Sequence, residues 1–349
     1  MKKLWWLLLL AVPLLSHETL TTTVLFDREI VRILDKHCVM CHAEGGPSFP
    51  LETFDQTWLK KRQIHAQTIA RHMPPWPAVP GYGQFANDNS LTLRESQFVI
   101  SWVEGLGPRN SGTVFLNVTG ADAARPAEVR ARPDFEHRKL GQPSEIQKVP
   151  ATFVIDLGLK SARRLRGWEF LPADRKNLQA ASFQVRETGQ WIGSWTPWYG
   201  FLKLPGTRAF VLPAGAHIVV ELQYKGARPA NPGSLGLYWA DASSAAMGSD
   251  LTLIAAAAGE RVRAVMKLTR QTSVVALRPE VEAGAKSIEV SARKPDGSTE
   301  VLLLAREPSK EWPTPFVFQA PVTFPAGTEL SVVVHYARSG GVRLTVSQY

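Results

Sequence analysis

The sequence predicts a multidomain protein in which a small all-α unit is followed by two antiparallel β-sandwiches in tandem, of jelly-roll-like form. Three observations support this fold class. Apolar residues recur at helical spacing in the first third of the chain, and short alternating strands separated by turn residues follow later. The chain of 349 residues also exceeds the usual size of one domain. We expect the all-α unit over 19–108, a connector over 109–150, and sandwiches over 151–245 and 246–349.

The chain begins with a segment typical of export signals. Lys2 and Lys3 precede an apolar stretch of twelve residues, Leu4 to Leu15. This length matches the apolar core of a signal peptide and is short for a membrane-spanning helix. We therefore expect 1–18 to be a cleaved signal or a retained anchor, and the protein to be periplasmic or otherwise exported. Membrane contact is expected only through this segment, if it is retained.

Composition argues against several classes of protein. Apolar residues make up 44% and charged residues 20% of the chain, close to the globular average, which argues against disorder and against a multi-span membrane protein. The net charge of +9 raises nucleic acid as a partner, but the Lys and Arg residues are scattered and the export segment argues against it. We expect no nucleic-acid partner and a solvated basic surface.

Three helices are expected in the first unit. The first precedes a pair of cysteines and carries its apolar residues at helical spacing: Phe26, Ile30, Ile33 and Leu34. Glu44-Gly45-Gly46-Pro47 then breaks the chain, and a second helix is predicted over about 57–71, ending before Met73-Pro74-Pro75-Trp76. A third is predicted over about 92–104, and its inward-facing residues are Phe98, Val99 and Trp102. Together they predict a helical cradle around the cysteine pair.

The two cysteines of the chain, Cys38 and Cys41, lie in one Cys-x-x-Cys-His motif that ends at His42. Two thiols at this spacing on one helical turn can each bond a vinyl group of a haem, and the next residue turns its imidazole toward the iron. The alternatives are a redox-active dithiol, half of a zinc site, or a disulfide. No βαβ pattern or second pair of zinc ligands accompanies the motif. We therefore predict one covalent haem c on Cys38 and Cys41, with His42 as an axial ligand of the iron.

Met73 is the predicted ligand on the other side of the iron. Pro74 and Pro75 behind it force an extended, stiff segment that can hold a thioether over the haem face. The remaining methionines lie in the export segment, inside the attachment motif or far along the chain: Met1, Met40, Met247 and Met266. A core methionine is the alternative role for Met73, and His72 is the rival ligand.

At this point a family resemblance becomes specific. The Cys-x-x-Cys-His, the Gly45-Gly46-Pro47 after it, the stretch from Arg71 to Trp76 and the helix that carries Trp102 resemble a particular group of proteins. They are the class I cytochrome c domains fused to copper type II, ascorbate-dependent monooxygenase-like proteins of bacteria. The resemblance implies that 19–108 form a cytochrome c domain.

Beyond the connector the pattern changes to short alternating runs that predict strands. Turn residues such as Pro213-Ala214-Gly215 separate them, at the spacing of an antiparallel sandwich. The predicted strands cover 152–155, 182–185, 217–224, 235–239, 273–277, 287–292, 300–304 and 330–336.

This half resembles the two-domain core of the peptidylglycine-hydroxylating and dopamine-hydroxylating copper enzymes and their bacterial relatives. The similarity lies in framework segments: Leu212–Gly215 leading into Val219–Tyr224, and Lys294–Gly297 leading through Trp312 to Phe324–Thr328. These segments imply a pair of sandwiches and say little about chemistry.

The copper ligands that the resemblance implies are replaced in this chain. The family's adjacent histidine pair falls near Gln179 and Ala180, its histidine before tyrosine falls on Gln223, and its His-x-His falls on Glu280 and Glu282. The histidines beyond the helical unit are His137, His217 and His335. Copper that cycles between oxidation states needs imidazole and thioether ligands, so copper is not expected as a cofactor. Glu280 and Glu282 share a strand face and fit either a hard-cation site or solvated carboxylates.

A dense aromatic cluster occupies the middle of the first sandwich: Trp191, Trp195, Trp198 and Tyr199. It fits a platform for a small ligand, a docking surface for another protein, or packing at a sandwich end or against the helical unit.

Two functions from different classes follow. The favoured hypothesis is an electron carrier with no catalytic residues, in which one haem exchanges electrons with a redox partner protein and the sandwiches serve docking or ligand binding. The competing hypothesis is a copper- or other metal-dependent monooxygenase that its own haem supplies with electrons. A third is a structural or ligand-binding protein with an incidental haem.

Overall fold

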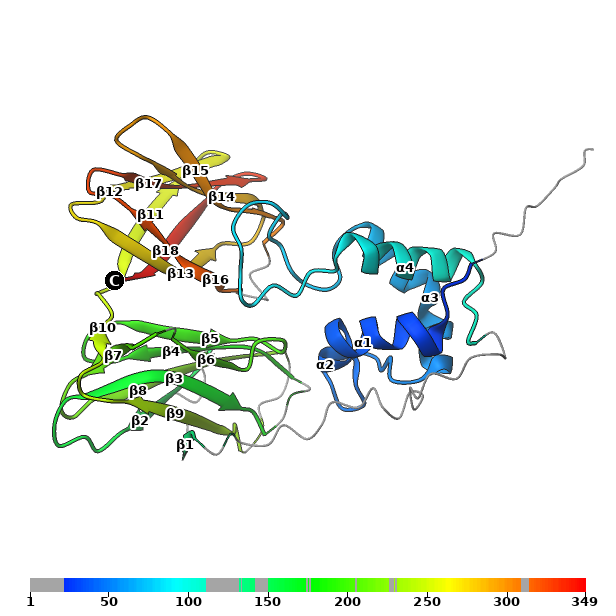
Figure 1. The fold of residues 1–349 in the computed structure, drawn as a ribbon, viewed down its shortest axis with the longest axis horizontal. Coiled ribbons are helices and arrows are strands. Elements are labelled where there is room, and N and C mark those ends of the chain that lie inside the picture. The colour runs from blue at the N-terminus through cyan, green and yellow to red at the C-terminus, as the bar shows by residue number, and fades with distance from the viewer. Residues whose placement is uncertain are drawn as a thin grey trace, which may run out of the picture.

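The computed structural model describes residues 22–110, 132, 134–141, 150–173, 175, 177–204, 206–225, 229, 231–308 and 314–349. The expected export segment, 1–18, and most of the expected connector lie outside these residues. Helices gather at one end of the molecule, and two β-sandwiches stand one above the other at the other end (Figure 1). No helix in the described ranges is long and apolar enough to cross a membrane.

The helices lie where the sequence predicts them, with small shifts at their starts. A π-helical turn, Phe26–Ile30, continues into α1 (Val31–His37) and α2 (Val39–His42), and α3 (Phe54–Ile69) and α4 (Leu93–Glu104) follow. Capping boxes define two starts, because the Thr53 and Thr92 side chains accept from the backbone three residues on. The helices share a cluster of buried residues: Val24, Phe26, Ile30, Val31, Ile33, Leu34, Val39, Leu51, Val99 and Trp102.

The first sandwich contains one sheet in the order β1-β9-β3-β7-β10, with β6 paired to β3, and a second in the order β2-β8-β4-β5. Pairing is antiparallel except between β10 and β7. This departs from the all-antiparallel expectation because the two-residue β10 is an edge strand on the way out to the second sandwich. The strands are β1 Glu136–Lys139, β2 Ala151–Asp156, β3 Arg163–Leu171, β4 Leu178–Val185, β5 Trp191–Trp195, β6 Phe201–Lys203, β7 Arg208–Leu212, β8 His217–Tyr224, β9 Ser234–Ala240 and β10 Ala245–Ala246.

The second sandwich packs the sheet β11-β18-β13-β16 against the sheet β12-β17-β14-β15. Alternate residues of β14 point inward: Ile288, Val290 and Ala292 are buried. The strands are β11 Leu251–Ala257, β12 Arg261–Lys267, β13 Thr272–Val281, β14 Ala285–Arg293, β15 Thr299–Arg306, β16 Phe316–Phe324, β17 Glu329–Tyr336 and β18 Gly340–Gln348.

The structure therefore confirms the coarse prediction of a mostly β-sandwich chain with few helices. One strand lies in a range where a connector was expected: β1 pairs with β9 over Glu136–Lys139. Its sequence, Glu-His-Arg-Lys, carries no apolar alternation, so the sequence alone offers no strand signal there.

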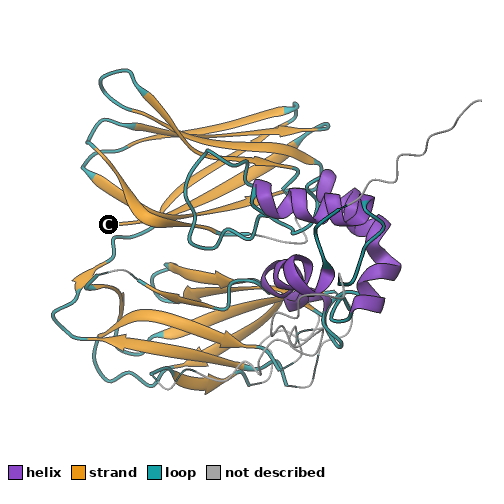
Figure 2. Cartoon of the chain, turned by 45° about the vertical axis from the view of Figure 1, so that its right-hand side comes forward, coloured by secondary structure: helices purple, strands orange, loops and turns teal. Residues whose placement is uncertain are grey.

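The segment between α3 and α4 leaves the helices and packs on the second sandwich; we call residues 74–87 the strap. Trp76 and Phe85 belong to the core of that sandwich, at 7% and 4% exposure. Their rings contact Phe316, with centroids 5.3 Å apart in each case. The loop that joins the helices reaches the upper sandwich in two views (Figures 1 and 2).

Backbone hydrogen bonds fasten the strap to two strands. The Val79 amide donates to the Leu304 carbonyl (2.7 Å) and the Arg306 amide to the Pro77 carbonyl (2.9 Å), both on β15. On β16, the Ala86 amide donates to the Val317 carbonyl (2.7 Å). The strap thus contacts both sheets of the second sandwich, which ties the helices to it.

Asp250 lies at the junction of the two sandwiches. Its Oδ2 accepts from the Trp191 amide (2.6 Å), while its Oδ1 is buried without a hydrogen-bond partner. Burial raises the pKa of the Asp250 carboxyl from 3.8 to about 6, although the Trp191 amide and the Arg278 charge oppose the shift. An ionised Asp250 therefore destabilises the folded junction.

Replacing Asp250 with asparagine is expected to stabilise the protein above pH 6. The folded-state pKa is raised, so ionisation costs stability as pH rises from about 4 to 6, and the amide removes that cost. The gain is about 1–3 kcal/mol at pH 7.5, since one pKa unit corresponds to about 1.4 kcal/mol. Thermal unfolding at pH 7.5 and pH 4 measures it, and a gain of equal size at both values would contradict the assignment.

Candidate functional site

The Cys-x-x-Cys-His motif spans the join between α1 and α2. Cys38 closes α1, and the amides of Cys41 and His42 both donate to the Cys38 carbonyl, at 3.0 Å and 2.9 Å. Both thiols and the imidazole therefore sit on one turn, and neither cysteine forms a disulfide. Gly46 brings the following loop back against the motif, where a side chain at this position would meet the Cys41 carbonyl oxygen at 2.5 Å.

His42 is held in one orientation and one tautomer. Its Nδ1–H donates to the Phe49 carbonyl (2.8 Å), and the Phe49 ring packs edge-on with centroids 4.8 Å apart. Nε2 consequently keeps its lone pair, and no hydrogen bond to another described residue occupies it. Burial lowers the pKa of His42, so the imidazole is neutral at physiological pH. A neutral imidazole with a free Nε2 is the form that binds iron.

The two cysteines are half-buried, and the loss of hydration around the thiols raises the pKa of each to about 12. A reactive dithiol requires the opposite shift, toward the thiolate. The protonated state of the pair therefore argues against a redox-active Cys-x-x-Cys.

A basic side chain of the first sandwich lies beside the motif. The positive charge of Arg175 opposes the rise in the pKa of the Cys41 thiol. The Arg175 Nη2 donates a hydrogen bond to the carbonyl of Pro197 (3.1 Å), which is next to Trp198 in the sequence. The haem-type motif thus faces the first sandwich, as the position of α2 also shows (Figure 1).

Next to the motif lies a buried polar network of His37, Asn89 and Glu95, which the sequence analysis did not predict. His37 is 5% exposed, and its Nδ1 lies 3.2 Å from both oxygens of Asn89. Its Nε2 lies 3.2 Å from Glu95. Burial alone would raise the pKa of Glu95, but hydrogen bonds from Thr92, Lys36 and His37 outweigh it and lower the pKa to about 2. The signal for this network was the polar His37 directly before Cys38.

Met73 follows the end of α3. Arg71 adopts a left-handed conformation (φ 54°), its amide donates to the Thr68 carbonyl, and the His72 amide donates to the Gln67 carbonyl. This is a Schellman ending, here with arginine in the place that glycine usually takes. The Met73 side chain is 43% exposed, whereas His72 Nε2 lies 3.5 Å from Glu307 of the second sandwich. Of the two candidate ligands, His72 is thus paired with a carboxylate, whereas Met73 is partly exposed to solvent.

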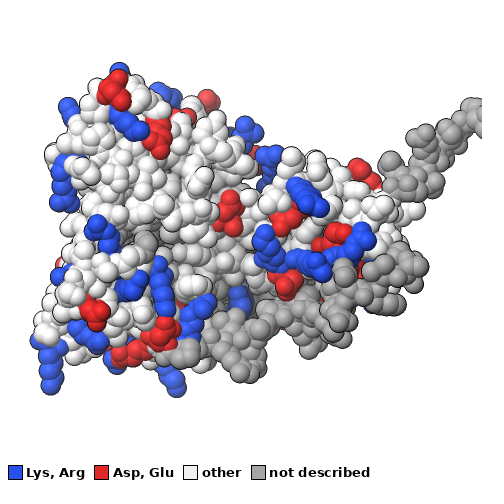
Figure 3. All heavy atoms as spheres, in the orientation of Figure 1, with Lys and Arg blue, Asp and Glu red and all other residues white. Residues whose placement is uncertain are grey.

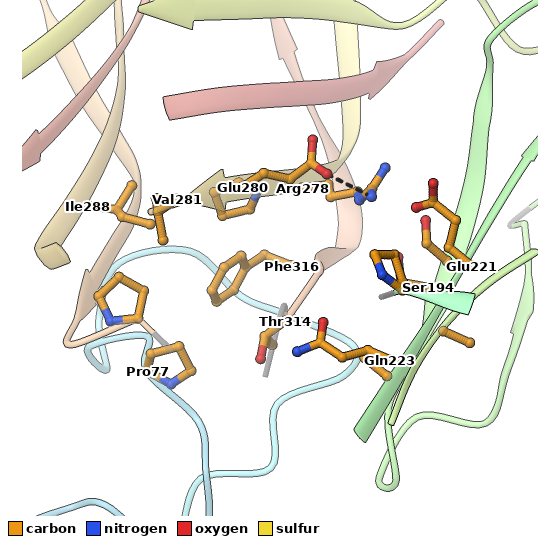
Figure 4. Close-up of a pocket in the computed structure, with 16 residues that line it drawn as sticks. Pro77, Ser194, Glu221, Gln223, Arg278, Glu280, Val281, Ile288, Thr314 and Phe316 are labelled. Atoms are coloured by element: carbon orange, nitrogen blue, oxygen red, sulfur yellow. Dashed lines mark hydrogen bonds and ion pairs between the residues drawn. The ribbon is translucent and has the colours of Figure 1, made fainter. Parts of the chain in front are cut away.

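A cavity of about 230 Å³ opens between the two sandwiches. Glu221 and Gln223 of β8 face it from one side, and Arg278 and Glu280 of β13 face it from the other (Figure 4). Arg278 Nη2 donates to Glu280 (2.9 Å). Pro77 of the strap also lines the cavity.

Three of the positions where the sequence resemblance leads one to expect copper ligands meet at this cavity. Ala180, Gln223 and Glu280 come from different strands and both sandwiches, yet all line it. Glu280 lines the cavity but Glu282 does not, so the two carboxylates do not face one site there. Within the described ranges, no three His, Cys, Asp or Glu side chains gather as a metal site.

The aromatic cluster is used mainly for packing. Trp191 and Trp195 are buried, at 3% and 2% exposure. Trp191 packs with Ala276 and Val317 of the second sandwich, and Tyr199 joins the same contact. Trp191 and Tyr199 therefore lie at the junction of the two sandwiches, and Trp195 lies in the core of the first sandwich. Packing was the expected role, but these contacts are made between and within the sandwiches.

The histidines that follow the helical unit are spread over separate sites. His137 bridges Ser234 (3.0 Å) and the buried Glu169 (3.1 Å) across β1, β9 and β3. His217 pairs with Glu187 at 2.8 Å, and His335 is exposed on β17. Charged residues of both signs are likewise scattered over the face in Figure 3.

No protein-family model matches the chain, and no curated protein matches it. Among solved structures, the major capsid protein of bacteriophage PM2 aligns over 61% of this chain and 96% of its own, with 8% identity and a TM-score of 0.32. Allantoicase aligns over 59% and 80%, with 12% identity and a TM-score of 0.21. A triple jelly-roll protein of an archaeal virus aligns over 63% and 60%, with 9% identity and a TM-score of 0.23. None of these similarities bears on function.

Proposed function

We propose that this protein is an exported c-type cytochrome that transfers one electron at a time through a single haem c, bound covalently by Cys38 and Cys41. The observation that carries the proposal is the helical turn on which two thiols and one imidazole with a free Nε2 stand together. The helical segment is accordingly proposed as a cytochrome c domain.

The residues around the motif fit this group. A haem bound there would supply an iron that cycles between the ferrous and ferric states. His42 would hold one axial position, since Phe49 fixes its tautomer and ring orientation. The buried apolar cluster against which Cys38 packs, which includes Val39 and Leu51, would exclude water and favour the less charged state of the iron.

Met73 is the proposed second axial ligand, ahead of His72. The His72 imidazole pairs with Glu307 and points to the second sandwich. The Met73 thioether has no hydrogen bond or ring contact among the described residues, and two prolines follow it. Methionine ligation raises the reduction potential of a haem relative to other ligands.

The sandwiches are proposed to be a monooxygenase-like module without copper chemistry that serves docking or ligand binding. The convergence of Ala180, Gln223 and Glu280 on one cavity supports the relationship to the copper enzymes. A methyl, an amide and a carboxylate replace the imidazoles that copper of this type requires. A redox partner protein, still to be identified, would accept or donate the electron.

Absorption spectra of the exported protein, oxidised and reduced, test the proposal. We expect one haem per chain, a reversible change between the two states, and a weak sulfur-to-iron band in the oxidised form. The variant Met73→Ala should lose that band, whereas the adjacent control His72→Ala should keep it. A haem that cannot be reduced and reoxidised would overturn electron transfer. If the unchanged protein lacks the sulfur-to-iron band and its spectrum changes in His72→Ala but not in Met73→Ala, the ligand assignment is reversed.

Metal analysis separates this proposal from the competing monooxygenase. Iron without copper in the purified holoprotein is the expected result. Near-stoichiometric copper beside iron would support the monooxygenase instead.

A further inference from the structure

The strap joins the proposed axial ligand to the second sandwich over a short distance. Only Pro74 and Pro75 separate Met73 from Trp76, which packs in the core of that sandwich. Each residue adds at most about 3.6 Å, so the Cα atom of Met73 lies within about 11 Å of that of Trp76. Two consecutive prolines also fix their φ angles, which leaves little freedom between the two residues.

The far end of the strap is fastened by the side chain of Asn87. This amide is 3% exposed; its Nδ2 donates to the Pro315 carbonyl (2.6 Å), and its Oδ1 accepts from the Val317 amide (3.0 Å). Asn87 thereby completes the edge of β16 as a neighbouring strand would. A buried amide that satisfies two backbone groups is costly to remove, because both groups lose their partner.

The helices themselves hold Met73 weakly. Its amide makes one long hydrogen bond, 3.4 Å to the Gln67 carbonyl at the end of α3. The preceding His72 pairs with Glu307, so the second sandwich contacts the chain on both sides of Met73.

We infer that the second sandwich, acting through the strap, positions Met73 for the haem iron. Docking of the strap on the second sandwich and binding of Met73 to the iron are then coupled, so that each favours the other. Asn87, which holds the strap, is a positioning residue for the iron ligand. This inference rests on the proposed function and deepens it, because it assigns to the second sandwich control of the haem's sixth ligand.

Competition with imidazole in the oxidised holoprotein tests the inference. Added imidazole binds the iron only when Met73 leaves it. Asn87→Ala should therefore bind imidazole about tenfold more tightly than the unchanged protein, a difference of about 1.4 kcal/mol. The matched control is Thr323→Val, which removes a hydrogen bond to Ser273 at the other end of the same strand, β16, and should bind imidazole as the unchanged protein does.

Hydrogen exchange of the unchanged holoprotein gives a second measurement that needs no variant. Coupling is reciprocal, so saturating imidazole should speed exchange at the Val79 and Ala86 amides of the strap. The Val334 amide inside β17 should be unaffected. Unchanged exchange in the strap would overturn the inference even if Asn87→Ala does not fold.

The outcomes separate this inference from the proposed function. If Met73→Ala binds imidazole more tightly than the unchanged protein but Asn87→Ala does not, the positioning role is overturned and Met73 stays the ligand. A shift of equal size in Thr323→Val also overturns it, because the effect would then reflect general destabilisation. If Met73→Ala and the unchanged protein bind imidazole with equal affinity, Met73 is not the ligand and the inference is overturned. Covalent attachment and reversible reduction of the haem then still test the proposed cytochrome.

Discussion

Replacing both Cys38 and Cys41 with alanine is expected to abolish covalent haem completely. The thiols are the only cysteines of the chain, so no other side chain can form a thioether. Haem staining of the denatured protein and intact mass, compared with the unchanged protein, measure the loss. Each single variant should retain haem through one bond, with a shifted absorption band because one vinyl group stays unsaturated.

A histidine pair controls for general damage to the helical unit. His42→Ala should lose the proposed iron ligand, and its absorption spectrum should differ from that of the unchanged protein. The reason is that Nε2 of His42 is the free imidazole nitrogen of the motif. His65→Ala should keep haem and spectrum, since His65 lies on α3 outside the motif and its Nε2 lies 3.4 Å from Glu104. Covalent haem in the double cysteine variant would refute the attachment site.

Replacing Phe85 with alanine is expected to destabilise the protein by about 3–5 kcal/mol, the usual cost of removing a buried phenylalanine ring. Phe85 is 4% exposed and its ring contacts Trp76, Phe316 and Phe318. The loss should fall on the second sandwich as well as on the strap, because this ring belongs to the sandwich core. Thermal unfolding followed by circular dichroism, with hydrogen exchange to locate the loss, measures it.

The control for Phe85→Ala is Leu93→Ala. Leu93 begins α4, close in sequence to the strap, but its side chain is 74% exposed. Its removal should change stability by less than about 0.5 kcal/mol, as is usual for surface positions. Comparable losses in the two variants would mean that the strap is not part of the sandwich core.

The sequence predicted the features that depend on near neighbours. Periodicity located α3 and α4, and Thr53 and Thr92 explain why the helices begin where they do. Alternation located strands such as β8 and β17 within a residue or so. The motif around Cys38 and His42 was equally accessible, because all its groups lie on a single turn.

Features that depend on distant partners were not accessible. Trp76 and Phe85 lie in a segment with neither helical nor strand periodicity, and their partners belong to β16. The pairing of β1 with β9 joins residues about a hundred positions apart, as His137 with Gly236 shows. Large aromatic residues in an otherwise irregular segment were the signal that the segment is buried.

For the candidate cavity, the sequence predicted some of the residues but not that they lie together. Gln223 and Glu280 were singled out by resemblance, from positions far apart in the chain, and no periodicity links them. Only the arrangement of the two sandwiches brings them to one cavity. The proximity of Arg175 to Cys41 depends instead on how the first sandwich lies against the helices, so spacing in the sequence could not predict it.

The strap also determines the order in which this protein can be completed during synthesis. Asn87 bonds to residues 228 and 230 positions later, so its site on β16 does not exist until nearly the whole chain has been made. At about 5–20 residues per second, ribosomes need on the order of 10–50 s to cover that interval. Cys38 and Cys41 are therefore made long before the strap can dock on β16. On the proposed function, haem could be attached to Cys38 and Cys41 before β16 holds the strap.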